Sequence, residues 1–148
     1  MKRLVHVPGI FASAVAVSVF AAAPAEAYGE KNSWSMRYGN GTIAGENTWY
    51  NQSVNIEGLH YVPSGASECR RLWVVARTTS GTHLANASST WKCSEGTFPY
   101  EMTVNTQYPG GPADIEVTWQ AKDKADYPDE VYRIVDSVTC FRAYYNCG

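Results

Sequence analysis

Residues 69–93 read CRRLWVVARTTSGTHLANASSTWKC. Two runs rich in Val, Thr and Ala flank a Ser80-Gly81 turn signal, which is the pattern of an antiparallel hairpin. A turn centred near Gly81 places Cys69 opposite Cys93, and directly opposed residues of antiparallel strands can lie within disulfide reach. We therefore expect a hairpin that is closed by a disulfide between these two cysteines.

The chain contains four cysteines, and an even set in an exported chain predicts two disulfides. Four cysteines allow three connectivities. The hairpin register favours Cys69–Cys93, which leaves Cys140 to pair with Cys147. The spacing contains no C-x-x-C pair, so no zinc site is expected.

The N-terminus has the composition of a secretory signal peptide. A short basic head precedes an apolar run, and Ala25 and Ala27 supply small residues at the positions that a signal peptidase reads. Cleavage is expected before Tyr28. Residues 1–27 are therefore predicted to be a signal peptide and residues 28–148 a single domain that is secreted.

The charge of the chain argues against two classes of partner. The formal net charge is −2 at pH 7, and the charges are scattered. A mildly acidic domain has no electrostatic reason to bind nucleic acid or an anionic membrane. No second apolar run approaches the roughly 20 residues that a membrane-spanning helix needs. We expect neither a nucleic acid nor a membrane as partner.

A second hairpin is predicted around the sequence PGGP at residues 109–112. The flanking runs, residues 100–108 and 113–121, alternate apolar and polar residues in step with a turn at PGGP. The expected cross-strand pairs are Met102 with Trp119, Val104 with Val117, and Thr106 with Ile115. In the first hairpin, the same reasoning places Arg71 beside Trp91 as a cation–π pair.

The rest of the chain also has strand character. Residues 33–38 alternate cleanly, residues 48–62 form a β region with an expected break near residues 57–58, and residues 131–145 form a last one. A change of phase at residues 136–137 predicts a β-bulge. About seven to eight strands in one domain predict an all-β fold, a two-sheet antiparallel β-sandwich stabilised by disulfides, with a small closed barrel as the alternative.

Two histidines, His60 and His83, are the candidates for acid–base chemistry. A hydrolase needs a histidine and a carboxylate in one cleft, and Glu57, Glu101 and Glu116 are the carboxylates considered. His60 is interpreted as lying on the polar phase of its strand. Serines next to glycine belong to predicted turns, and no G-x-S-x-G motif occurs. The prediction is that the chain has no catalytic residues.

The charged segment at residues 122–130 reads KDKADYPDE. Carboxylates spaced three apart could hold calcium. The segment lacks the alternating ligands and the central glycine of a calcium-binding loop, and Lys122 and Lys124 partly neutralise it. We interpret it as a solvated surface loop. No metal and no cofactor are expected.

Aromatic residues are more numerous than one core of this size needs. All five Trp and all ten Tyr follow the predicted leader. We expect two of Trp73, Trp91 and Trp119 to lie in the core and the outward aromatics to bind a ligand. Trp49 and Tyr50 are adjacent in a strand, so one of them should point outward. The candidate binding residues are Trp34, Tyr38, Trp49, Tyr50, Tyr144 and Tyr145.

These features predict a secreted, non-enzymatic binding protein. The first hypothesis is an extracellular protein partner, which the chain would engage as an enzyme inhibitor or as an adaptor subunit, through edge strands and surface aromatics. The second is carbohydrate binding on aromatic platforms, so a glycan ligand is possible. The third is a small hydrolase that uses His60 or His83. Specific capture of a protein would support the first hypothesis, and retention on polysaccharide would support the second. Loss of activity on His→Ala substitution would support the third.

Overall fold

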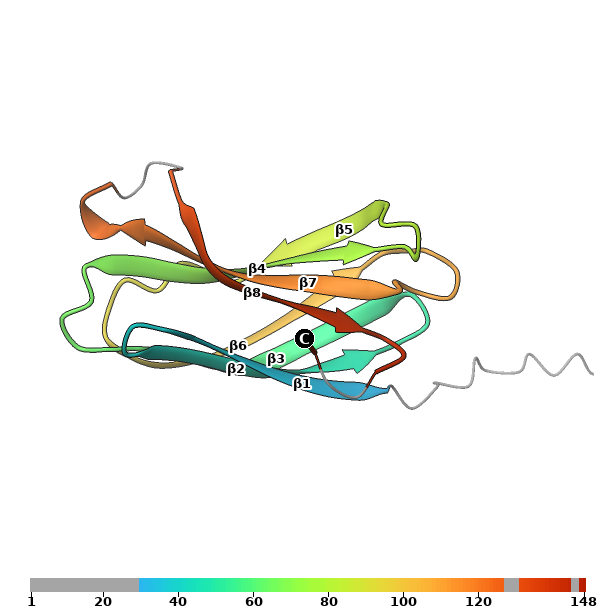
Figure 1. Cartoon of the computed structure of the whole chain (residues 1–148), viewed down its shortest axis with the longest axis horizontal. Coiled ribbons are helices and arrows are strands. Elements are labelled where there is room, and N and C mark those ends of the chain that lie inside the picture. Colours follow the sequence, from blue (N-terminus) through green and yellow to red (C-terminus); the bar gives the residue numbers. More distant parts are fainter. Residues whose placement is uncertain (1–29, 127–130, 145–146) are drawn as a thin grey trace, which may run out of the picture.

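Two four-stranded antiparallel sheets face one another in the computed structural model, which describes residues 30–126, 131–144 and 147–148 (Figure 1). The strand order is β1-β2-β3-β6 in the first sheet and β5-β4-β7-β8 in the second. The prediction of an all-β, disulfide-stabilised sandwich is therefore confirmed. The strands are β1 (Lys31–Tyr38), β2 (Gly41–Trp49), β3 (Ser53–Val62), β4 (Glu68–Arg77), β5 (His83–Ser88), β6 (Gly96–Asn105), β7 (Asp114–Asp123) and β8 (Arg133–Phe141), with a 3₁₀ turn, η1 (Lys124–Asp126), after β7.

The core lies between the sheets and follows from the alternation along each strand. In β1, Asn32, Trp34 and Met36 are buried, whereas the residues between them are exposed. Side chains of successive strand residues point to opposite faces, so this pattern turns one face of each sheet inward. The largest side chains that are fully buried are Trp49, Trp119, Ile43, Ile56, Leu72 and Ile115.

The first predicted hairpin is confirmed. β4 and β5 pair antiparallel, and an isolated bridge joins Arg70 to Lys92 beyond the end of β5. Cys69 and Cys93 form a disulfide next to that bridge, and Cys140 and Cys147 form the second one. The expected contact between Arg71 and Trp91 is also present: the guanidinium carbon lies 4.6 Å from the ring centroid.

The second predicted hairpin is wrong. β6 pairs with β3 in the first sheet, and β7 lies between β4 and β8 in the second, so the PGGP loop crosses from one sheet to the other. Val104 and Val117 are both fully buried, but they face the same core from opposite sheets. Two strands that face one core from either side show the same alternation as two strands of a hairpin.

Two smaller predictions have different outcomes. β3 runs unbroken through residues 57–58, and the chain instead turns at residues 50–52. In β8 the register shifts where Asp136 pairs with Trp119 and Ile134 pairs with Gln120. The predicted bulge is therefore present, one residue earlier than the expected break.

Gly58 is required because a neighbouring ring occupies the space over it. Tyr100 donates a hydrogen bond from its hydroxyl to the carbonyl of Ala44 (2.8 Å), so its ring crosses the glycine. A Cβ atom at Gly58 would lie 2.1 Å from that carbonyl oxygen and 2.5 Å from the Tyr100 hydroxyl. The backbone oxygen cannot move away without disturbing the ladder between β2 and β3.

We predict that Gly58→Ala lowers the free energy of unfolding by about 1–3 kcal/mol, the usual cost of overpacking. Urea denaturation checks this value. The matched control is Glu57→Ala at the neighbouring exposed position, which should change stability by less than about 0.5 kcal/mol. Equal stability of the two variants would show that the sheet relaxes around the added methyl group.

Candidate functional site

Two of the candidate binding residues are not on the surface. Trp34 is 6% exposed and Trp49 is 1% exposed, so neither offers the exposed ring that the binding hypothesis requires. Both indole N–H groups donate to buried amides: Trp34 to Asn47 Oδ1 (2.9 Å) and Trp49 to Asn32 Oδ1 (3.2 Å). A buried indole N–H needs such a partner, and the two asparagines provide it.

The same asparagines hold the C-terminal segment. Asn47 donates to Asn32 Oδ1 (2.8 Å), and the Asn32 amide donates to the carbonyls of Phe141 and Tyr144 at 3.1 and 3.0 Å. Asn47 also contacts the sulfur of Cys147 (3.7 Å). This network fixes the second disulfide loop against β1 and β2, and it gives Trp34 and Trp49 a structural role.

The predicted tyrosines do not form one surface. Tyr50 is exposed while Trp49 is buried, so the expectation that one of this pair points outward is confirmed. Tyr144 is also exposed. Tyr38 is half-buried, with its ring against Trp119 at 6.4 Å. Tyr145 lies outside the described residues.

The histidines lie in different sheets. His60, in β3, is 2% exposed and packs edge-on against Trp119, with ring centroids 5.5 Å apart. It therefore faces the core, and its assignment to the polar phase of the strand is wrong. Its pKa is lowered to about 4 because burial removes water, and the charges of Arg70 and Lys92 add to this effect. His83 is exposed near Asn86.

The three carboxylates considered as partners for a histidine lie elsewhere. Glu57 and Glu101 point out of the first sheet, opposite to His60. Glu116, in the second sheet, accepts a hydrogen bond from Arg77 (3.0 Å). The arrangement therefore brings neither histidine together with these carboxylates. Within the described residues, no group of three or more His, Cys, Asp or Glu side chains could hold a metal ion.

The predicted pair of Arg71 and Trp91 belongs to a larger aromatic cluster, whose other rings, Trp73 and Tyr132, the sequence analysis missed. The Arg71 guanidinium lies 4.6 Å from the ring of Trp91 and 5.5 Å from those of Trp73 and Tyr132, and its Nε donates to Gln120 (2.8 Å). Trp73 and Trp91 are half-buried on the outer face of the second sheet, and Trp119 is fully buried. The expectation that two of these three tryptophans lie in the core is therefore wrong. The Arg71 guanidinium already lies over one face of each of these rings.

The outer face of the first sheet carries a different kind of surface, because no element of the described chain packs over it. Leu59 is 56% exposed and Tyr61 42% exposed on β3. Ala44 and Pro99 are exposed and flank Leu59 on the neighbouring strands. These four residues form one apolar area, which we call the β3 patch: Ala44, Leu59, Tyr61 and Pro99.

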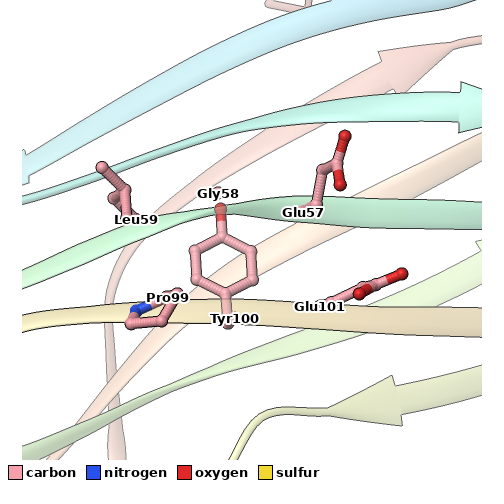
Figure 2. Close-up of a pocket in the computed structure, with 6 residues that line it drawn as sticks. All are labelled: Glu57, Gly58, Leu59, Pro99, Tyr100 and Glu101. Atoms are coloured by element: carbon pink, nitrogen blue, oxygen red, sulfur yellow. The ribbon is translucent and has the colours of Figure 1, made fainter.

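An acidic row borders the β3 patch. Glu46 pairs with Glu57 across β2 and β3, and Glu57 pairs with Glu101 across β3 and β6. Lys31 forms an ion pair with Glu46. Figure 2 shows Glu57 and Glu101 on one side of the Tyr100 ring and Leu59 on the other. These residues line an open hollow of about 590 Å³. Like charges that are directly opposed destabilise a sheet, so a cation from a partner would relieve this row.

The signal for this patch was present in the sequence. Residues 59–62 read LHYV, and the apolar residues occur on both phases of the strand. A polar histidine between two apolar residues suggested that His60 faces solvent, whereas the structure turns Leu59 and Tyr61 outward. Because His60 was assigned to the wrong face of the strand, the apolar surface in the middle of the sheet was not predicted.

Comparison with protein-family models, with curated proteins and with solved structures finds no match to this chain. In the part of the chain that the structure describes, no helix is long and apolar enough to cross a membrane.

Proposed function

We propose that the chain is an exported binding protein that engages another extracellular protein through the outer face of its first sheet, as an enzyme inhibitor or an adaptor subunit. The observation that carries this proposal is the β3 patch with the acidic row beside it. Protein interfaces combine an apolar centre with a polar or charged rim, and Leu59 and Tyr61 would supply the centre. Glu57 and Glu101 would supply the rim.

Two features favour a protein over a glycan as the ligand. Sugar rings stack on flat, exposed aromatic faces, but the tryptophans of this chain are buried or half-buried. The β3 patch is mainly aliphatic around Leu59 and Pro99, and it lies on the flat surface of a sheet. Exposed aliphatic and tyrosine side chains with adjacent carboxylates suit a partner surface that is apolar and basic.

The proposal is tested by capture from culture fluid of the source organism with the tagged chain from Tyr28 onward. We predict that this protein retains one partner in stoichiometric amount and that Leu59→Asp weakens the binding by about 30-fold, the effect of losing a central contact worth about 2 kcal/mol. The matched control is Ile134→Asp. Ile134 is similarly exposed, at 60%, but lies on the other sheet. This variant should bind like the wild type.

Three other results would count against the proposal. Loss of the partner with Ile134→Asp but not with Leu59→Asp would move the contact to the second sheet. Equal binding by all three proteins would exclude both surfaces. An empty capture together with retention on insoluble polysaccharide would replace the protein partner with a glycan.

A further inference from the structure

The edges of the two sheets are unequally protected against the addition of another strand. On β8, both backbone groups of Thr139 pair with Gly148, with N–H···O distances of 3.1–3.2 Å. The N–H of Ser137 is taken by the carboxylate of Asp136 (2.8 Å), and a bulge bends the strand at its start. Natural sheets block their edges in these ways, so β8 is closed to a further strand.

The other side of the sandwich is also protected. β5 has only six residues and lies beside β6 of the other sheet. Thr106 donates its N–H to the carbonyl of Gln52 in the connection before β3 (2.9 Å). Because bonded pairs alternate along an antiparallel ladder, the even-numbered β6 residues bond with β3, and the odd-numbered ones direct their N–H and C=O groups away from the sheet. Pro99 is one of these residues, and it offers no N–H to a neighbour.

β1 lies beside β8 of the other sheet, as β5 lies beside β6, but within the described residues it has no further protection. The N–H of Trp49 donates to the carbonyl of Glu30 (2.9 Å). Because bonded pairs alternate along the ladder, the even-numbered β1 residues bond with β2, and the odd-numbered β1 residues direct their N–H and C=O groups away from the sheet. Ser33, Ser35 and Arg37 therefore present free N–H and C=O groups, for which the described residues contain no partner. β1 has no proline and no bulge, and an open hollow lies beside the two serines.

We propose that β1 pairs antiparallel with β1 of a second copy of this chain, with Ser35 opposite Ser35 on the twofold axis. In this register the outward backbone groups of Ser35 bond across the axis, and those of Ser33 bond with Arg37 of the second copy. The two first sheets then form one continuous sheet of eight strands. A twofold contact requires a self-complementary surface, and this register provides one.

Charge complementarity indicates that the strand pairing with the edge of β1 comes from a second copy of this chain. Ser33 pairs with Glu46 within one chain, so Arg37 of the second copy would lie in the same cross-strand row as Glu46, with one small serine between them. An arginine side chain spans that gap. Arg37 is exposed and, within the described residues, has no ion pair. Lys31 already forms an ion pair with Glu46 within one chain, and the dimer adds a second cation to each of the two acidic rows.

Neighbouring registers are less favourable. A slip by one pair toward the N-terminus places Lys31 opposite Arg37 of the second copy, and like charges that are directly opposed are destabilising. A slip in the other direction puts Ser33 opposite Gly39, beyond the end of β1, and moves Arg37 away from the acidic row. The register with Ser35 on the axis avoids like charges and uses the strand from Ser33 to Arg37.

Sedimentation velocity from micromolar to submillimolar concentration tests the proposal on the chain from Tyr28 onward, which contains every described element. We expect twice the monomer mass for the wild type and the monomer mass for Ser35→Pro. The proline removes an outward N–H that makes no bond within the chain, so the fold should persist. Thr103→Pro, at an outward position of edge strand β6, is the matched control and should remain dimeric.

A second variant tests the register. Arg37→Glu should weaken association about tenfold or more, because it places two carboxylates in one row across the interface. A wild-type protein that stays monomeric over the whole concentration range would overturn the proposal. Dimers of Ser35→Pro as stable as those of the wild type would assign dimerisation to another surface, and equal association of Arg37→Glu would exclude this register. None of these results depends on the extracellular partner.

Discussion

Replacing Cys69 and Cys93 by alanine should lower the free energy of unfolding by about 3.5 kcal/mol. The disulfide joins residues 24 positions apart, and a cross-link over a loop of that length removes about this much conformational entropy from the unfolded chain at room temperature. Cys69 is fully buried at the start of β4. Denaturant unfolding of the double variant and of the wild type, both under non-reducing conditions, measures the difference.

The second disulfide provides the comparison. Cys140 and Cys147 are seven positions apart, and the same relation gives about 2.5 kcal/mol for their loop. This loop also carries the carbonyls that Asn32 bonds, so its removal should loosen the end of β1, and hydrogen exchange there should rise. A decrease in the free energy of unfolding of less than about 1 kcal/mol for the Cys69–Cys93 variant would contradict the prediction. It would mean that the cross-link does not stabilise the fold by lowering the entropy of the unfolded chain.

The features that were predictable from the sequence are those set by local spacing. The turn at Ser80-Gly81 fixed the partners of the first hairpin, and the cysteines at its two ends followed from that register. The phase change near Asp136 located the bulge in β8 to within one residue. In each case the turn or bulge and the paired residues lie close together in the chain, so alternation and turn chemistry suffice.

Features set by the packing of one sheet on the other were not predictable in this way. Val104 and Val117 show matched alternation whether they pair in a hairpin or face each other across a core. Trp34 looked like a surface aromatic because nothing near it in the sequence shows that Asn47 receives its N–H. Leu59 could be placed outward only once His60 was known to pack against Trp119, which lies in the other sheet.

The phase of β3 has a thermodynamic consequence at His60. The ring is buried against Trp119, and its pKa falls from 6.5 to about 4 because burial and the nearby charges of Arg70 and Lys92 disfavour the protonated form. The unfolded chain therefore binds a proton at this site at a higher pH than the folded chain does. This contribution to stability is fully present above pH 6.5 and is lost as the pH falls toward 4.

We predict that His60 makes the folded protein less stable by about 3 kcal/mol at pH 4 than at pH 7.5, from about 1.4 kcal/mol for each unit of pKa difference. His60→Phe keeps a ring against Trp119 and removes the proton-binding site. Its free energy of unfolding should therefore fall about 3 kcal/mol less than that of the wild type over this range. The shared effect of the carboxylates cancels in the comparison.

The measurement is urea unfolding of both proteins at several values between pH 7.5 and pH 4. His83→Phe is the matched control, because His83 is exposed on β5 and the variant should follow the wild type. Parallel curves for His60→Phe and the wild type would mean that the folded protein binds a proton at His60 as readily as the unfolded chain. A difference that develops between pH 6.5 and pH 4 would place the histidine in the core, on the face opposite to Leu59 and Tyr61.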